Sequence, residues 1–233
     1  MANTTESLDL YAKVEDLLEN SEAIETLYNV YYEILSQLSF DSLLDVGCGS
    51  GTYLVGLTEQ FPAVSAKGID LSSVMVSRAQ AKGVDAEAID LCDLDGSFDV
   101  ITAVFDMLNY LPKEALEGFF SCICAHLNEG GYFLFDINTL YGFEHVAVGA
   151  YVIEDERRFL AIDSDFDEGV YEAQFTLFER EGACYEKSQE TIRQYYHTVK
   201  EIETISGMKL VNAQEIELYG LGDEDKVLVV LKK

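Results

Sequence analysis

Between residues 42 and 137, short apolar runs alternate with segments of helical periodicity, and this alternation limits the possible folds more than any other feature. Five segments have the length and apolar content of short buried strands, at residues 43–46, 65–69, 84–89, 98–104 and 131–137. Helical segments are expected at residues 52–61, 72–82 and 112–127. Strands that alternate with helices form parallel sheets with right-handed crossovers. The alternation therefore predicts a doubly wound α/β core.

The segments on either side of this core have different patterns. Residues 6–38 carry two apolar stripes at helical spacing, which predict two helices separated near Asn20 and Ser21. Segments rich in Tyr, Phe, Val and Thr, at residues 151–154, 158–162, 170–179 and 185–197, predict antiparallel sheet. A helix at 199–205 and strands at 210–218 and 226–231 are expected to follow. We expect a seven-stranded, mostly parallel sheet whose last strand is antiparallel, with an antiparallel β insert between strands five and six.

The charge, the termini and the cysteines restrict the partners and the compartment. The 233-residue chain has 43 acidic and 15 basic residues, for a formal net charge of −28. Nucleic acids and anionic membrane surfaces would be repelled, so neither is an expected partner. The N-terminal segment lacks a basic leader and no apolar run approaches about 20 residues, which predicts a cytoplasmic protein. The five cysteines have scattered spacing and no CxxC pair, which predicts reduced thiols instead of disulfides or a zinc site.

A glycine-rich turn follows the first predicted strand. In the sequence from Asp45 to Gly51, the glycines Gly47, Gly49 and Gly51 alternate with other residues, and Cys48 lies between the first two. Glycines in such a turn permit positive φ and let the backbone approach a ligand closely. The spacing is GxGxG, whereas the dinucleotide fingerprint is GxGxxG. The turn predicts a ligand site and speaks against a nicotinamide cofactor.

Polar residues end the next three predicted strands. Asp70 lies 19 residues after Gly51, where a carboxylate can accept both hydroxyls of a ribose, and Asp90 ends the third strand. The fourth strand ends at Phe105 and Asp106. Ligands of open α/β sheets bind outside the carboxyl ends of the strands. These residues are therefore expected to surround one binding site.

These motifs resemble those of the class I S-adenosylmethionine-dependent methyltransferases. The segment Asp106-Met107-Leu108-Asn109-Tyr110-Leu111, the strand ending at Asp136 and the β-rich insert are similar to a bacterial small-molecule subgroup that includes aminosugar N,N-dimethyltransferases. The resemblance is strong over residues 40–137, moderate over the two terminal strands, and looser over the N-terminal helices and the insert. It implies a helical lid at 1–40, a cofactor-binding core at 41–137, a substrate-side insert at 138–198 and a final part, 199–233, that completes the sheet.

The resemblance implies roles for individual residues around S-adenosylmethionine. The loop from Gly47 to Gly51, including Cys48 and Gly49, would run beneath the methionine moiety, with Asp45 near its ammonium group. Asp70, followed by Leu71, would hold the ribose. Asp90 and Leu91 would contact the adenine, and Phe105 and Asp106 would lie beside the sulfonium. Tyr11, on the N-terminal helix, would cover the cofactor.

Candidate acceptor-side residues come from two places. Asp106, Asn109 and Tyr110 follow the fourth strand and are catalytic candidates, and His197 is the best-placed base among the three histidines. Three further residues end the insert and are candidates for substrate binding: Arg193, Tyr195 and Tyr196. The carboxylates at residues 163–169 do not match a calcium loop, and we expect no metal.

The resulting hypothesis is methyl transfer to a nitrogen or oxygen nucleophile of a small molecule, with nitrogen favoured by the aminosugar-like resemblance. Such a reaction is an in-line displacement that needs alignment and exclusion of water more than a catalytic triad. Two alternatives remain open from the sequence. They are a nicotinamide-dependent oxidoreductase and a module that binds S-adenosylmethionine without turnover. A monomer or homodimer is expected.

Overall fold

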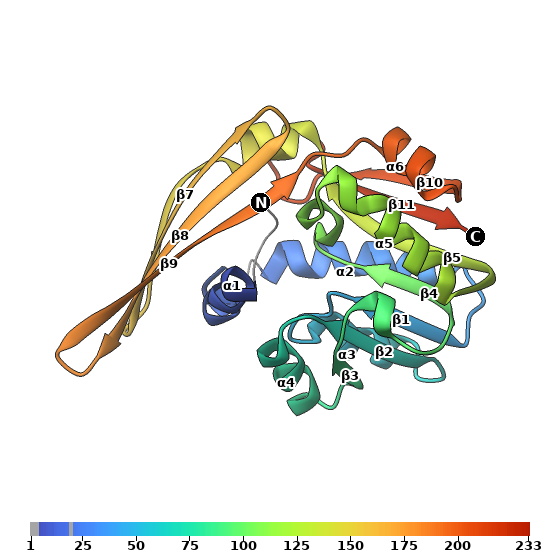
Figure 1. Ribbon diagram of the computed structural model, residues 1–233, viewed down its shortest axis with the longest axis horizontal. Coiled ribbons are helices and arrows are strands. Elements are labelled where there is room, and N and C mark those ends of the chain that lie inside the picture. Colours follow the sequence, from blue (N-terminus) through green and yellow to red (C-terminus); the bar gives the residue numbers. More distant parts are fainter. Residues whose placement is uncertain (1–4, 19–20) are drawn as a thin grey trace.

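The computed structural model describes residues 5–18 and 21–233, and its centre is a seven-stranded sheet in the order β10-β11-β5-β4-β1-β2-β3 (Figure 1). All its strands run parallel except β11, which is antiparallel to both of its neighbours. The strands are β1 (Ser42–Val46), β2 (Ser65–Asp70), β3 (Ala86–Ala88), β4 (Phe98–Ala103), β5 (Leu127–Asn138), β10 (Lys209–Ile216) and β11 (Lys226–Lys232). The predicted doubly wound α/β sheet with one antiparallel strand is confirmed.

Helices cover both faces of this sheet because its strands are apolar on both sides. The helices are α1 (Thr5–Leu18), α2 (Ser21–Leu35), α3 (Thr52–Gln60), α4 (Ser73–Ala81), α5 (Lys113–His126) and α6 (Val199–Ser206). The helices α5 and α6 bury residues such as Phe120 and Ile202 against one face. The helices α2, α3 and α4 bury Leu27, Leu54 and Ala79 against the other. Of the two helices in the predicted lid segment, α2 packs against the core sheet, whereas α1 packs in a separate cluster.

The insert between β5 and β10 forms a second sheet of four antiparallel strands in sequential order. These strands are β6 (Gly149–Glu154), β7 (Arg158–Asp167), β8 (Val170–Glu181) and β9 (Cys184–Tyr195), and they make a long twisted ribbon beside the core (Figure 1). The helix α1 packs on this ribbon through Leu10 and Val14, which contact a cluster that includes Phe175 and Ile192. It also contacts α4, so α1 lies between the insert and the core.

Three short helical turns connect the larger elements: η1 (Leu91–Asp93), η2 (Met107–Tyr110) and the π-helical turn η3 (Gly142–Ala147). Several predicted boundaries differ from the structure, and the largest differences are at β5 and β7. The helix α5 ends at His126, and β5 begins at once with Leu127, which pairs with Phe98. The pairing of β5 with β4 is irregular around Gly130, whose φ is 78°. Gly130 and Gly131 therefore lie within the strand instead of before it. The strand β7 extends to Asp167, which leaves a tighter hairpin turn at Glu168 and Gly169.

The prediction of reduced thiols is wrong for two of the five cysteines. Cys92 of η1 and Cys122 of α5 form a disulfide, with their Cα atoms 5.2 Å apart. Residues 30 positions apart meet here because α5 packs against η1. Cys48, Cys124 and Cys184 are free thiols. None of the helices that the structure describes is both long enough and apolar enough to cross a lipid bilayer.

Candidate functional site

The glycine turn between β1 and α3 brings backbone to the edge of a large cavity. Gly47, Gly49 and Gly51 all have positive φ, of 75°, 53° and 77°. The N–H groups of Gly47 and Cys48 donate to the Ile69 carbonyl at 2.8 and 2.9 Å, which fixes the turn against β2. A Cβ on Gly51 would lie 2.8 Å from the Ala79 Cβ. Gly51 therefore permits close packing on α4, whereas the other two glycines line the cavity.

This cavity has a volume of about 820 Å³ and lies along the carboxyl ends of β1, β2, β3 and β4. All the predicted cofactor-binding residues except Gly51 line it. The lining also includes residues that sequence reasoning missed, among them Glu15, Tyr28, Ser72, Met75 and Phe119. Five of its described lining residues are acidic and none is Lys, Arg or His. The cavity is therefore suited to a ligand with positive charge.

Asp70 and Asp90 are both oriented by backbone N–H groups. Asp70 accepts from the N–H of Gly49 at 2.9 Å and from that of Ser72 at 2.8 Å. Asp90 accepts from the N–H of Cys92 at 2.8 Å and begins η1. Burial raises the pKa of Asp70 above its usual range, although these backbone donors oppose the shift. Each carboxylate keeps acceptor capacity for a ligand hydroxyl or amino group.

Asp45 lies deeper, on β1, where its side chain is 2% exposed. The Thr102 hydroxyl donates to it at 2.7 Å. Burial raises the pKa of Asp45 to about 7, and the nearby Asp70 carboxylate acts in the same direction. A cation that entered the cavity beside Asp45 would restore the charged carboxylate.

The turn after β4 is strained, and Asp136 holds it. Phe105 and Asp106 have φ values of 58° and 49°, which non-glycine residues seldom adopt. The Asp136 carboxylate on β5 accepts from the N–H of Phe105 at 2.7 Å and from that of Asp106 at 2.8 Å. Tyr31 of α2 donates to the same carboxylate at 2.8 Å. The core thereby supports a conformation that projects Asp106 into the cavity.

Lys226, at the start of β11, is the second group that sequence reasoning missed. Its side chain is 1% exposed, and its Nζ lies 2.6 Å from Asp106 Oδ1, 3.0 Å from Asn138 Oδ1 and 3.1 Å from Asp136 Oδ2. Burial favours the neutral amine, but the two carboxylates together raise the pKa of Lys226 above its usual range. Lys226 is therefore a buried cation that is paired with two carboxylates and donates hydrogen bonds to Asp106 and Asn138.

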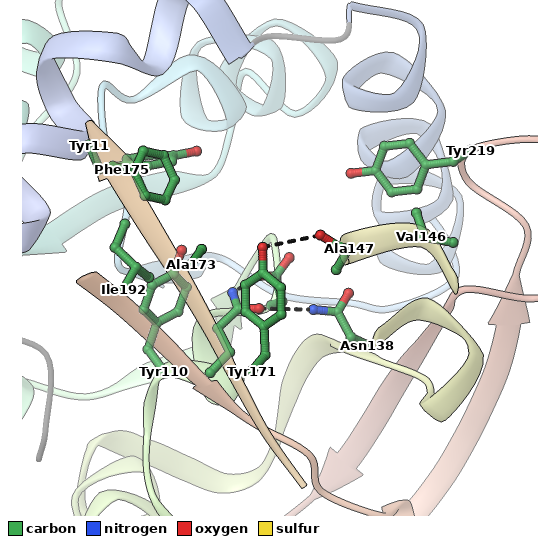
Figure 2. Close-up of a pocket in the computed structure, with 12 residues that line it drawn as sticks. Tyr11, Tyr110, Asn138, Val146, Ala147, Tyr171, Ala173, Phe175, Ile192 and Tyr219 are labelled. Atoms are coloured by element: carbon green, nitrogen blue, oxygen red, sulfur yellow. Dashed lines mark hydrogen bonds between the residues drawn. The ribbon is translucent and has the colours of Figure 1, made fainter. Parts of the chain in front are cut away.

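A smaller cavity of about 230 Å³ lies between the core sheet and the insert (Figure 2). Figure 2 shows Tyr11, Tyr110, Tyr171 and Tyr219 around it, with the Tyr171 hydroxyl directed at the Ala147 carbonyl, 3.3 Å away. Four residues line both cavities: Tyr11, Asp106, Tyr110 and Tyr219. The two cavities therefore meet at a junction formed by three tyrosines and one carboxylate. Tyr219, in the loop after β10, was not predicted.

The predicted acceptor-side residues divide into two groups. Asp106 and Tyr110 line both cavities, whereas Arg193, Tyr195 and Tyr196 line neither. Successive residues of a strand face opposite sides. On β9 the residues that line the small cavity are Ile192 and Gln194, each next to a predicted residue on the opposite face of the strand. Arg193 instead forms an ion pair with Glu172 on the neighbouring strand β8.

Asn109 and His197 are also outside both linings. Asn109 is fully buried, donates to the Tyr195 carbonyl at 2.8 Å and accepts from the N–H of Asn138 at 3.0 Å, so it joins η2, β5 and β9. The Nε2 of His197 lies 2.9 Å from the Leu111 carbonyl, and burial lowers the pKa of His197. Asn109 and His197 therefore connect segments that surround the cavities, without lining either cavity themselves. No cluster of three or more His, Cys, Asp or Glu side chains that could hold a metal ion occurs among residues 5–18 and 21–233.

Comparison with known proteins gives a consistent result. The sequence model of a methyltransferase domain family matches residues 43–131. A putative methyltransferase of Geobacillus sp. (strain WCH70) is 33% identical over 166 residues, which cover 65% of this chain and 66% of that protein. The match thus spans slightly less than two thirds of each chain.

Two solved structures share the fold over nearly the whole chain. An S-adenosylmethionine-dependent methyltransferase from Clostridium acetobutylicum superposes with a TM-score of 0.72 at 23% identity, over 97% of this chain and 96% of that one. A sugar N-methyltransferase from Streptoalloteichus sp. superposes with a TM-score of 0.71 at 19% identity, over 100% and 94%.

Proposed function

This chain belongs to the S-adenosylmethionine-dependent methyltransferase family, and from that premise we propose that it transfers a methyl group to a nitrogen or oxygen nucleophile of a small molecule. The observation that carries the proposal is the junction of the two cavities. A large cavity with the glycine turn and the strand-end carboxylates shares Asp106 and three tyrosines with a small one. In-line displacement needs a donor site and an acceptor site that meet at one point.

The lining of the large cavity fits S-adenosylmethionine. This cofactor carries a sulfonium and an ammonium group against one carboxylate, and the described lining offers five acidic residues and no basic one. A dinucleotide would bring a pyrophosphate that no side chain of this lining could neutralise, which speaks against the nicotinamide alternative. When bound, the cofactor supplies a methyl group on a positively charged sulfur.

The residues of the chain would bind, align and shield the reactants. Asp70 would accept the ribose hydroxyls, Asp90 with Leu91 the adenine, and Asp45 the ammonium group. Phe105 and Asp106 would lie beside the reacting centre. Tyr11 of α1 lines both cavities and would cover the junction from the insert side. Excluding water and fixing the angle of approach supply several kcal/mol in such reactions.

Replacing Asp70 with alanine is expected to weaken binding of S-adenosylhomocysteine, the demethylated cofactor, at least tenfold, or about 1.4 kcal/mol. The substitution removes the ribose acceptor and the carboxylate that orients the Gly49 N–H. Isothermal titration calorimetry measures the effect. Asp85→Ala, at an exposed position on the segment before β3, is the matched control and should bind like the wild type. If the wild-type protein does not bind S-adenosylhomocysteine, the proposed function is wrong.

Cofactor affinity is also expected to depend on pH through Asp45. With its pKa at about 7 in the free protein, Asp45 is mostly protonated at pH 6 and must lose a proton to pair with the ligand ammonium. Affinity for S-adenosylhomocysteine should therefore rise about tenfold from pH 6 to pH 8, with proton release on binding at the lower pH. Five titratable groups interact electrostatically with Asp45, and burial raises the pKa of each: Asp70, Cys48, Tyr31, Tyr32 and Tyr53.

Calorimetry in two buffers of different ionisation enthalpy measures both quantities. Asp45→Asn should bind more weakly at pH 8 and show a flat profile, because it has no proton to release. A wild-type profile as flat as that of Asp45→Asn would contradict the assignment of Asp45.

A further inference from the structure

Asp106 occupies the point at which the two cavities meet, and it is the single charged residue among the described residues that line the smaller one. Its side chain is 18% exposed, so it is open to a ligand. The smaller cavity has a volume of about 230 Å³, so the part of a ligand that lies inside it must be compact. Whatever enters it meets the Asp106 carboxylate next to the cofactor cavity.

The Asp106 carboxylate is held in a fixed orientation from two sides. Lys226 donates to Oδ1 at 2.6 Å, and the Gln194 side-chain amide donates to Oδ2. Gln194 is itself fixed by Asn138, whose side-chain amide donates to it at 3.3 Å. Each oxygen of Asp106 keeps a second lone pair, because a carboxylate offers about four acceptor positions. The orientation is therefore set by the protein, while acceptor capacity remains for a ligand.

The charge balance at this point is negative. Lys226 faces two carboxylates, Asp106 and Asp136, so the formal charge of the three groups is −1. Lys226 is 1% exposed, lines neither cavity and is already paired with both carboxylates, so it is shielded from an anionic ligand. The remaining described lining is aromatic or uncharged, with four tyrosines whose ring faces also favour a cation. A phosphate or carboxylate on the acceptor would have no cationic partner here.

We propose that Asp106, positioned by Lys226 and Gln194, binds the amino group of the acceptor, so that the substrate is a primary or secondary amine. This inference rests on the proposed methyl transfer. A neutral amine would donate an N–H to Asp106 and direct its lone pair at the methyl carbon. The nitrogen lone pair forms the new C–N bond as the C–S bond breaks, and the bonding pair of that bond stays on sulfur. The positive charge thereby moves from sulfur to nitrogen, where Asp106 stabilises the ammonium product.

The test compares two cofactor analogues and needs no knowledge of the acceptor. Sinefungin has an amine-bearing carbon where S-adenosylmethionine has its methylated sulfur, so its amino group would project into the junction, and S-adenosylhomocysteine has nothing there. We expect the wild type to bind sinefungin at least tenfold more tightly than S-adenosylhomocysteine. In Asp106→Asn this ratio should fall below about threefold, while affinity for S-adenosylhomocysteine stays within about threefold of the wild-type value.

Two further variants examine how Asp106 is positioned. Gln194→Met removes the donor to Oδ2 without adding charge and should lower the ratio by part of the Asp106→Asn effect. Folded Lys226→Met protein should show a ratio at least as low as that of Gln194→Met. Asp163→Asn makes the same change in net charge at an exposed position of β7 and should keep the wild-type ratio.

The outcomes separate this inference from the proposed function. If S-adenosylhomocysteine binds and depends on Asp70, but the wild-type ratio is near one or survives in Asp106→Asn, the amine-binding role of Asp106 is wrong and the methyltransferase proposal stands. If Asp106→Asn lowers the ratio and Gln194→Met leaves it unchanged, Gln194 does not position Asp106. If the wild type binds neither analogue, the amine-binding role of Asp106 and the proposed methyltransferase function are both wrong.

Discussion

Replacing Lys226 with methionine is expected to lower the free energy of unfolding by about 3–5 kcal/mol. Methionine fills a similar volume but leaves the carboxylates of Asp106 and Asp136 next to each other without their cation. Removing one partner of a buried ion pair strands a charge where water cannot solvate it, and this cost exceeds that of losing a surface contact. Urea or guanidinium unfolding, with fluorescence and circular dichroism as probes, gives the value.

Two comparisons make this result specific. Lys209→Met removes a lysine from an exposed position of β10, the neighbouring strand, and should change stability by no more than about 0.5 kcal/mol. The double variant Lys226→Met/Asp106→Asn should recover part of the loss, because only one buried carboxylate then remains without a cation. A loss below about 1 kcal/mol in Lys226→Met would show that the cation does not hold the two carboxylates.

Reduction of the Cys92–Cys122 disulfide is expected to lower the free energy of unfolding by about 3–4 kcal/mol. The bond closes a loop between residues separated by 30 positions, and breaking it lets the unfolded chain explore more conformations. Unfolding curves with and without reductant measure the difference, and Cys92→Ala/Cys122→Ala should match the reduced wild type.

The two exposed or half-buried thiols provide the control. Cys124→Ser and Cys184→Ser should leave the response to reductant unchanged, because neither residue takes part in the disulfide. Mass analysis of peptides under non-reducing conditions should find residues 92 and 122 in one linked pair. Equal stability with and without reductant, in protein that contains this pair, would contradict the expected contribution.

The lining of the large cavity could be predicted from the sequence because it depends on one geometric rule. In a parallel sheet the carboxyl ends of the strands meet at one edge, so Asp45, Asp70 and Asp90 had to lie near one another once the strands were recognised. The exception is Gly51, which has the positive φ expected of the loop but packs against Ala79. Spacing along the chain identifies the turn, and it does not say which glycine faces the ligand.

The residues that line the small cavity or hold Asp106 there could not be predicted, for two physical reasons. On β9 polar residues occur on both faces, so alternation could not distinguish Arg193 from Gln194, and a shift of one residue exchanges the faces. Lys226 begins an apolar strand and resembles an exposed terminal charge, and its partner Asp106 lies 120 residues earlier. The disulfide was missed in the same way, because packing of α5 on η1 brings Cys92 and Cys122 together.

The location of α1 has a consequence for the order of events in turnover. The helix is joined to the insert by Arg158, which contacts Asp16 at 2.6 Å, and to α4 by Arg78, which donates to the Ala12 carbonyl at 2.6 Å. Its Tyr11 lines both cavities, so one helix forms part of the wall of each. Under the proposed methyl transfer, a movement of α1 that released the spent cofactor would also open the smaller cavity to solvent. Exchange of cofactor and acceptor would then be linked through this one helix.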